Sequence, residues 1–506
     1  MAVSSLSAQK TKNLRPDLIV FIVVDQLRAQ ESSQLSIAKR SVNFSQTFHN
    51  HFCSETAPGH ATLLSGRLPA RHGIIANSWH EMPFMSLQNA GHDKSVQVLG
   101  GEGEAASARQ FVGDHLSSHW RSQKTGGRFI TLSWKDRAAV MLGGPAADIA
   151  LWAGSTGFVT SSFYNDSQKI KWLEDFNFKY PFSQYAGKSW PAAEKKALHK
   201  IPDSSEKWNK ILAYSPFADE LTLKLALEIT NAYQLGKSNR TDLLAISLSS
   251  TDYIGHKFSY NSPEMRHQLK LLNHRIVAFE AALRSRLPGK KISFVLTADH
   301  GGTKTPQVAE AMQEKPAIIK ETEFRKYFAQ KMKPSHPYFD YALLFRSPHF
   351  YLHYEAIGDA HFSRKEILSD MQKFARENDR IFATLSVDQK LKIVRSNKFQ
   401  KKDSLISDSE LWELAKNCHF PERSPQLLVI PAPYVFLQYE KGVSIAGHGS
   451  PFNDDRHVPL FFWGDGIRPA NKQSIVHTTR IAATLAEMAG FRYAPADGDV
   501  LPLDLN

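Results

Sequence analysis

The sequence has little cysteine and no apolar run long enough to cross a membrane. Its 506 residues include only two cysteines, Cys53 and Cys418. Two cysteines permit at most one disulfide bond and do not form a thiolate metal cluster, and we expect them to be unpaired, buried thiols. The longest apolar run near the start, residues 18–24, falls far short of the roughly 20 residues of a membrane span, so no membrane association is predicted.

The first residues also lack the hydrophobic core of a signal peptide. Residues 1–16 are mostly polar, and we expect this N-terminal segment to be flexible. Composition alone therefore leaves the compartment of the protein open.

Acidic residues are fewer than basic ones. The formal net charge is +12 and the isoelectric point is about 9.4. Such a charge favours anionic partners, whether phosphorylated small molecules, nucleic acid or anionic lipid. The basic residues are scattered along the chain, and the sequence contains no zinc finger and no aromatic RNA-binding signature. Specific nucleic-acid binding is therefore not predicted.

Three continuous runs of β-branched and other apolar residues indicate strands that are buried on both faces. The runs are residues 18–23, 243–248 and 292–296. Helices separate these strands; one begins after Ser262 and carries apolar residues at spacings of three and four up to Leu283. The order of strand, helix and strand predicts a doubly wound α/β sheet, in which ligands bind beyond the carboxyl ends of the strands.

We predict a core domain interrupted by two insertions. Residues 17–79 and 206–302 carry the core strands, and residues 426–506 complete the core. Residues 80–205 and 303–425 do not follow the alternation of strand and helix. Unstructured loops of that length are uncommon in a compact domain, so both stretches are expected to be folded insertions over one end of the sheet.

Acids and histidines follow the predicted strands or stand in glycine-rich loops: Asp25, Asp252 with His256, Asp299 with His300, and His448. Each taken alone is a weak signal, because such residues often only cap helices or satisfy turns. Together they offer nitrogen and oxygen ligands without thiolate, which suits a pair of zinc ions. Two metals about 4 Å apart serve phosphoryl transfer, one by activating the nucleophile and the other by stabilising the leaving oxygen.

Thr56 is the candidate nucleophile. It lies in the segment SETAPGHATLLSGRLPARHGIIANSW, residues 54–79, where a helix is predicted to begin. Taken alone, a threonine at a helix start is more typical of a cap. The distant acids and histidines favour the nucleophile, because the dipole and free N–H groups of a helix start stabilise an alkoxide and bound phosphate oxygens.

Six short motifs carry a family resemblance: Val-Val-Asp25, Thr56-x-Pro-Gly-His60-Ala, His72-Gly-Ile-x-x-Asn77, Thr251-Asp252-x-x-Gly-His256, Ala298-Asp299-His300-Gly and His448-Gly-Ser. In this order, over about residues 17–490, they resemble the alkaline phosphatase superfamily. Within it the chain most resembles the phosphate-irrepressible alkaline phosphatases of the bacterial periplasm, which use a threonine nucleophile. The resemblance implies an α/β/α sandwich with a large, mostly parallel central sheet and inserted cap segments.

The resemblance also implies a ligand set for each of two zinc ions. The sets are Asp252, His256 and His448 for one ion, and Asp25, Asp299 and His300, with the Thr56 oxygen, for the other. The implied mechanism is a double displacement. Thr56 attacks phosphorus, a phosphothreonine forms, and zinc-bound hydroxide then releases phosphate.

Lys135 and Arg137 favour a monoesterase. In the monoesterases resembled here, a Lys-x-Arg segment of this kind reaches the phosphate oxygens beside the asparagine that Asn77 matches. A dianionic monoester gains from two cations and an amide donor, whereas a diester carries one charge fewer. Taken alone, the segment around Lys135 would be a solvated charged turn and Asn77 a turn residue, and we interpret His60 as a packing residue of the helix start.

The predicted function is a two-zinc phosphomonoesterase of broad specificity, acting on small-molecule phosphate esters. A phosphodiesterase or nucleotide pyrophosphatase on the same scaffold is the alternative. A sulfatase is disfavoured because the segment after Cys53 lacks the Cys-x-Pro-x-Arg pattern, and a phosphomutase because it would use serine. By resemblance, we expect a periplasmic or secreted protein, and we expect a monomer.

Overall fold

The computed structural model describes most of the chain. The described residues are 15–82, 85–164, 170–191, 197–303, 317–335, 343–346, 349–352, 363–386, 392–397, 406–438 and 444–503. The N-terminal segment that we expected to be flexible, residues 1–16, lies almost entirely outside them. No helix in the described part of the chain has both the length and the apolar character that a membrane crossing requires.

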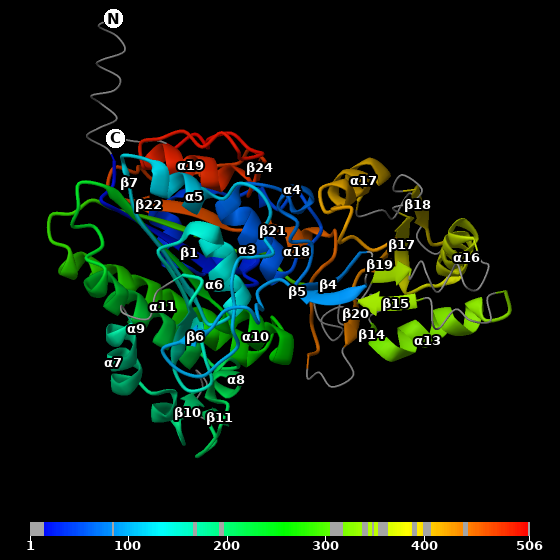
Figure 1. The fold of residues 1–506 in the computed structure, drawn as a ribbon, viewed down its shortest axis with the longest axis horizontal. Helices are drawn as coiled ribbons and strands as arrows, with labels where there is room; N and C mark the ends of the chain where they lie inside the picture. Colours follow the sequence, from blue (N-terminus) through cyan, green and yellow to red (C-terminus); the bar gives the residue numbers. More distant parts are fainter. Residues whose placement is uncertain are drawn as a thin grey trace, which may run out of the picture.

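A ten-stranded mixed sheet forms the larger part of the molecule (Figure 1). Its strand order is β23-β2-β22-β13-β1-β12-β7-β8-β9-β6. Five central strands pair in parallel: β13 (Ile292–Thr297), β1 (Leu18–Val24), β12 (Thr241–Leu248), β7 (Gly126–Ser133) and β8 (Ile149–Ala153). The flanking strands are β22 (Leu460–Gly464), β2 (Val42–Phe44), β23 (Ala470–Lys472), β9 (Phe158–Ser161) and β6 (Val98–Leu99). The predicted α/β class is confirmed, and the three predicted core strands are β1, β12 and β13.

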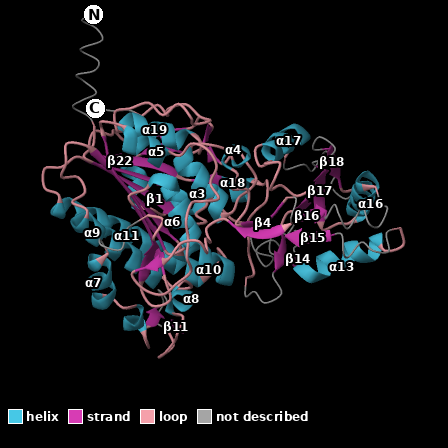
Figure 2. Cartoon of the chain, in the orientation of Figure 1, coloured by secondary structure: helices cyan, strands magenta, loops and turns pink. Residues whose placement is uncertain are grey.

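Helices cover both faces of this sheet (Figure 2). Along β1 the even-numbered residues pack into one hydrophobic core and the odd-numbered residues into another. The first core is closed by α9 (Phe217–Ala232) and α11 (Pro263–Arg286). The second is closed by α3 (Thr56–Ser65), α5 (Leu116–Ser122), α6 (Asp136–Gly143) and α19 (Arg480–Met488). Burial on both faces explains why these strands are continuously apolar.

The expectation that residues 80–205 form an insertion over one end of the sheet is wrong for their central part. The strands β6, β7, β8 and β9 of this stretch form one edge of the main sheet, and β7 pairs directly with β12. The β7 sequence begins with Gly126, Gly127 and Arg128 and includes threonine and serine, so its apolar run is short. Its position beside β12, and not its hydrophobicity, makes it a core strand.

A second, smaller body lies beside the main sheet, and we call it the small unit, residues 317–438 (Figure 1). Its antiparallel sheet has the order β15 (Leu343–Arg346), β16 (His349–Leu352), β19 (Leu427–Pro431), β17 (Ile381–Ser386) and β18 (Lys392–Arg395). One face packs against α13 (Glu321–Met332) and α16 (Arg364–Glu377), and the other against α17 (Asp408–Lys416). A parallel pair, β14 (Ala317–Lys320) and β20 (Val435–Gln438), completes it.

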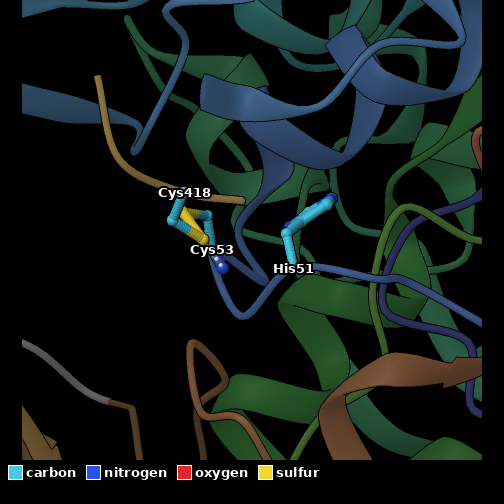
Figure 3. Close-up of side chains that lie close together, drawn as sticks. All are labelled: His51, Cys53 and Cys418. Atoms are coloured by element: carbon cyan, nitrogen blue, oxygen red, sulfur yellow. Dashed lines mark hydrogen bonds between the residues drawn. A yellow bond between two sulfur atoms is a disulfide. The ribbon is translucent and has the colours of Figure 1, made fainter. Parts of the chain in front are cut away.

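Cys53 and Cys418 form a disulfide, which corrects the expectation of two unpaired thiols (Figure 3). Cys53 precedes α3 and Cys418 follows α17, 365 residues later in the sequence. The bond therefore ties the segment that leads to Thr56 to the small unit. Nothing in the sequence relates two residues so far apart, so the pairing could be learned only from the fold.

We expect the unreduced, denatured protein to contain no free thiol, because the described chain has no free cysteine. Cys418→Ser should lower the free energy of unfolding by about 2–5 kcal/mol, since the bond restricts the unfolded chain. Thiol titration in guanidinium and denaturation curves of the variant would measure both quantities. Two reactive thiols before any reduction would contradict the pairing.

His115 should make the fold sensitive to acid. Its side chain is fully buried, and burial lowers its pKa from 6.5 to about 3. The folded-state pKa lies below the unfolded value, so this stabilising contribution is complete above pH 6.5 and is lost as the pH falls toward 3. The loss amounts to about 1.4 kcal/mol per pH unit.

His115→Gln should therefore lose less unfolding free energy than the wild type between about pH 6 and pH 4. Urea denaturation at both pH values would measure the difference. Equal losses in the two proteins would show that His115 is protonated as readily in the folded state as in the unfolded one.

Candidate active site

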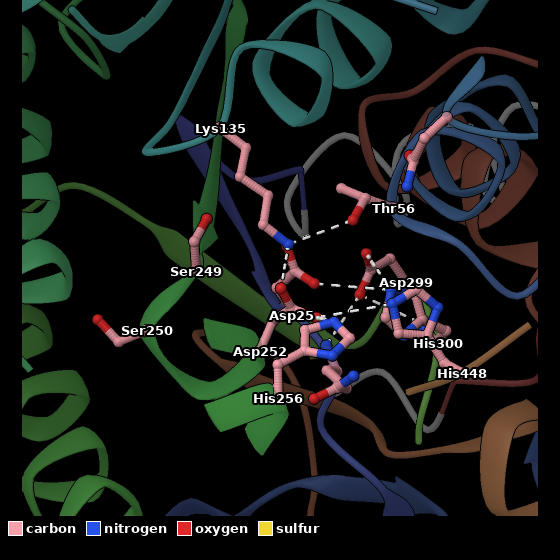
Figure 4. Close-up of polar contacts among 12 residues, drawn as sticks. Asp25, Thr56, Lys135, Ser249, Ser250, Asp252, His256, Asp299, His300 and His448 are labelled. Carbon is pink, nitrogen blue, oxygen red and sulfur yellow. Dashed lines mark hydrogen bonds and ion pairs between the residues drawn. The ribbon is translucent and has the colours of Figure 1, made fainter. Parts of the chain in front are cut away.

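Neighbouring strands bring the predicted site together at the carboxyl ends of the central strands of the main sheet (Figure 4). Asp299 follows β13, Asp25 follows β1, and Lys135 follows β7. Asp252 lies in α10 (Ser250–Phe258), which begins just after β12. The carboxyl ends of neighbouring parallel strands lie side by side, and these four side chains are therefore close together there. All four residues are buried.

Thr56 is the first residue of α3, and its side chain does not cap the helix. The cap is Glu55, which makes no side-chain capping bond. Thr56 is buried, and its hydroxyl oxygen accepts a hydrogen bond from the Lys135 ammonium at 3.2 Å. Gly59 lets α3 lie against the end of β13, because a Cβ there would stand 2.2 Å from the Asp299 carbonyl oxygen. Thr56 therefore faces the acids, as a nucleophile would.

Three histidines present the same ring nitrogen to the carboxylates. Nδ1 of each donates to a backbone carbonyl oxygen: His256 to Ala446 at 2.6 Å, His300 to Gly301 at 2.8 Å, and His448 to Ser54 at 2.6 Å. A carbonyl oxygen can only accept, so Nδ1 carries the proton and Nε2 keeps its lone pair. This arrangement is typical of histidines that bind metal through Nε2.

Asp252, His256 and His448 form the first cluster of metal-ligand type. Asp252 Oδ1 lies 3.2 Å from His256 Nε2 and 3.8 Å from His448 Nε2. Asp252 and His256 share one face of α10 as residues i and i+4. Ligands at zinc distances in a tetrahedron stand about 3.3 Å apart, so this cluster fits one zinc ion.

The second cluster, Asp25, Asp299 and His300, combines residues of two overlapping groups of metal-ligand type, which are Asp25 with Asp252 and His300, and Asp25 with His60 and Asp299. His300 Nε2 lies 3.3 Å from Asp299 Oδ2 and 3.6 Å from Asp25 Oδ1. Asp299 Oδ1 is held by the backbone N–H groups of Gln26 and His300, at 3.1 and 3.0 Å. Asp25 Oδ1 and His300 Nε2 are buried and have no hydrogen-bond partner among the described residues, and Asp299 Oδ2 is buried 3.0 Å from His60 Nδ1. Lone pairs that face one another in this way fit a cation bound between them.

Lys135 stands between the two clusters. Its Nζ lies 2.7 Å from Asp25 Oδ2 and 2.5 Å from Asp252 Oδ2. Burial alone would raise the pKa of Asp252, but Lys135 and then His256 lower it well below its ordinary value. Burial and the charge of Asp299 raise the pKa of Asp25 well above its ordinary value despite Lys135. Lys135 therefore does not offset the burial of Asp25 and its repulsion by Asp299, and a bound cation would favour the ionised form of Asp25.

Asn77 and Arg137 line a cleft that reaches Thr56. Asn77 Oδ1 accepts a hydrogen bond from the Ala57 N–H at 2.9 Å, which leaves Nδ2 as the end that can donate. Nε of Arg137 is buried and has no hydrogen-bond partner among the described residues. Nη1 of Arg137 stands 3.9 Å from the Asp136 carboxylate. Amide and guanidinium are thus available to an anion beside Thr56.

The cleft lies between the main sheet and the small unit and has a volume of about 450 Å³. The small unit contributes an arginine and several aromatic side chains to its wall: Arg346, His349, Tyr351, Tyr434 and Phe436. A pocket of this size accommodates a small organic molecule. The leaving group of a phosphate ester would extend from Thr56 toward this wall.

A sequence model of the type I phosphodiesterase / nucleotide pyrophosphatase family matches residues 19–451. The chain belongs to this family. Among relatives, it is 27% identical to alkaline phosphatase PhoK of Sphingomonas sp, over 94% of this chain and 88% of PhoK. It is 24% identical to alkaline phosphatase PafA of Elizabethkingia meningoseptica, over 96% of this chain and 94% of PafA.

Among solved structures, that of wild-type PafA is similar to this fold with a TM-score of 0.83. The sequence identity is 21%, and the match covers 96% of this chain and 98% of the other. This likeness confirms the predicted fold class. The family match and the two relatives, together with it, confirm the predicted resemblance to the alkaline phosphatase superfamily.

Two residues of this site were missed or misread from the sequence. We interpreted His60 as a packing residue, but its Nδ1 lies 2.8 Å from the Thr56 carbonyl oxygen and 3.0 Å from Asp299 Oδ2. Its spacing of four residues from Thr56 on one helix was the available signal. Glu55 was missed; its carboxylate accepts a hydrogen bond from the Asn77 N–H at 2.8 Å, a contact that requires the folded loop.

Proposed function

We propose that the chain is a metal-dependent phosphomonoester hydrolase of broad specificity, with Thr56 as the nucleophile. The observation that carries this proposal is the pair of aspartate and histidine clusters beside the buried Thr56 hydroxyl. Zinc ions would be held by the two sets Asp252, His256 and His448, and Asp25, Asp299 and His300 with Thr56. When bound, they would lower the pKa of the nucleophile and neutralise charge on the leaving oxygen. The names of the relatives PhoK and PafA support the same class.

The proposed reaction is a double displacement at phosphorus. Oγ1 of Thr56 forms a bond to phosphorus as the bond to the leaving oxygen breaks, which gives a phosphothreonine and an alcohol. Water then attacks the same phosphorus, and the bond to Oγ1 breaks to release phosphate and restore the hydroxyl. Lys135 Nζ, 3.2 Å from this oxygen, stabilises negative charge on it at the start and at the end.

Arg137, Lys135 and Asn77 support a monoester as the preferred substrate. Two cations and the Asn77 amide border the place that the phosphate oxygens would occupy. A monoester dianion gains more from them than a diester monoanion. Phosphodiester hydrolysis is the second candidate, and the family match favours it.

Rates on an aryl monophosphate and on a bis-aryl phosphate would separate the two candidates. We expect kcat/KM to be at least about tenfold higher for the monoester, which corresponds to about 1.4 kcal/mol of the transition-state free energy. Faster hydrolysis of the diester would contradict the proposed monoesterase and support phosphodiester hydrolysis as the main activity.

Metal removal should abolish this activity. A zinc chelator should remove turnover of the aryl monophosphate, and about two equivalents of zinc should restore it, because the two clusters offer one ion site each. Activity titrated against zinc measures the stoichiometry. Full activity in protein shown to be free of metal would contradict the two-zinc site.

The disulfide supports a periplasmic or secreted location, because such bonds persist in oxidising compartments. We also propose that the protein is a monomer in solution, which light scattering on a sizing column would test. Small-molecule phosphate esters are the proposed partners.

A further inference from the structure

His300 and His448 stand on two loops that are far apart in the sequence. One loop, residues 299–303, leaves β13; the other, residues 447–450, follows the small unit. The two imidazole rings are stacked with their centroids 3.8 Å apart. The relative position of these loops therefore decides where the two Nε2 atoms stand.

Asp455 holds both loops through its carboxylate. Oδ1 accepts a hydrogen bond from the Thr303 hydroxyl at 3.0 Å, and Oδ2 accepts one from the Ser450 N–H at 2.7 Å. Its backbone carbonyl oxygen also accepts from the Gly301 N–H at 2.7 Å. A Cβ at Gly301 would stand 2.1 Å from the Asp454 carbonyl oxygen, so this close backbone contact requires glycine.

Asp455 is costly to bury and does not line the substrate cleft. Its exposed fraction is 0%, and it lies outside the set of residues that line the cleft. Burial raises its pKa to about 7 even though the Ser450 and Thr303 bonds lower it. Burying this carboxylate costs free energy, and its hydrogen bonds to the two loops offset that cost. Its position outside the cleft lining indicates that it acts on the loops and not on the substrate.

We propose that Asp455 is a positioning residue of the metal centre, which sets the spacing of His300 and His448 through Thr303 and Ser450. This inference rests on the proposed function, because it requires that both histidines bind zinc. Asp455 acts by hydrogen bonds to the loops and touches neither the substrate nor the ligand nitrogens. Loss of a group that supports metal ligands typically weakens metal binding by about 10–100-fold.

Two substitutions at this position separate hydrogen bonding from charge. Asp455→Ala removes both side-chain acceptors. Asp455→Asn keeps a hydrogen bond to each loop, because its amide oxygen can accept from the Ser450 N–H while its NH₂ donates to the Thr303 hydroxyl oxygen. Zinc dissociation constants of the refilled full-length protein, measured by competition with a chromophoric chelator, should rise about 10–100-fold in Asp455→Ala and at most about threefold in Asp455→Asn.

Asp242 provides a matched control at the opposite end of β12. It is also a buried carboxylate that joins two segments, with backbone N–H donors from Arg128 at 2.6 Å and Gly236 at 2.7 Å. Asp242→Ala should destabilise the fold while leaving zinc affinity unchanged. Should Asp455→Ala not fold, Thr303→Val removes only the Oδ1 contact and should still weaken zinc binding, whereas Thr303→Ser should not.

Several results would overturn the inference. The first is wild-type zinc affinity in Asp455→Ala or, where that variant does not fold, in Thr303→Val. The second is a loss of zinc affinity in Asp455→Asn as large as that in Asp455→Ala. The third is a loss of the same size in Asp242→Ala. A wild-type protein that binds no zinc would overturn the proposed function and this inference together. Tight binding by the wild type that persists in Asp455→Ala would overturn the inference alone.

Discussion

Thr56→Ala should abolish turnover of an aryl monophosphate while the zinc content of the protein stays the same. In the proposed reaction the Thr56 oxygen forms the bond to phosphorus, and no second hydroxyl stands on the first turn of α3 to replace it. Loss of a nucleophile of this kind lowers kcat by at least about 10⁴-fold. Steady-state rates, with zinc measured by elemental analysis on the same samples, would test both parts.

Thr56→Ser is the matched control, because it keeps a hydroxyl within reach of Lys135 Nζ, which stands 3.2 Å from the native oxygen. It should retain most of the turnover, and its phosphorylated form should be trapped on serine after an acid quench. Thr62→Ala, on the same helix and outside the cleft lining, should leave kcat unchanged. Full activity in Thr56→Ala would contradict the assignment of the nucleophile.

The edge of the sheet that carries the site could be predicted from the sequence. The core strands β1, β12 and β13 were recognisable as continuous apolar runs, and parallel strands must end on the same side of a sheet, so Asp25 and Asp299 had to converge. Their ligand character followed from residue type. The sequence pattern could not show that Nδ1 of His256 and of His448 donates to a backbone carbonyl oxygen, because Ala446 and Ser54 reach these rings only in the folded chain.

The contacts that could not be predicted are long-range and come from segments without periodic hydrophobicity. The strand β7, which positions Lys135, was overlooked because its glycines and hydroxyl residues interrupt the continuous apolar run that identifies a buried strand. The disulfide and the bond between Asp455 and Thr303 join residues more than a hundred positions apart. In each case the chain topology brings the two residues together, and no local sequence pattern indicates the contact.

Removing the charge of Arg137 should harm monoester hydrolysis more than diester hydrolysis. Loss of one preorganised donor at a developing charge typically lowers kcat by about 10²–10³-fold. We expect that loss for Arg137→Ala on an aryl monophosphate, and a loss smaller by at least about tenfold on a bis-aryl phosphate, which has one negative charge fewer to bind. Arg109→Ala is the control, because the Arg109 side chain is exposed, pairs with Asp93 and lies outside the cleft lining.

Lys135→Ala should behave differently from Arg137→Ala, and the contrast tests the role of each cation. Lys135 lies within hydrogen-bond distance of Asp25, Asp252 and the Thr56 hydroxyl, so its loss should slow both substrates as well as disfavour the dianion. Among the described residues Arg137 has no ion pair closer than the 3.9 Å contact with Asp136, and its loss should act mainly on the substrate charge. Ratios of kcat/KM for the two substrates measure this contrast. Equal losses on monoester and diester in Arg137→Ala would show that Arg137 does not recognise the second charge, and the case for a monoesterase would then rest on Lys135, Asn77 and the names of the relatives.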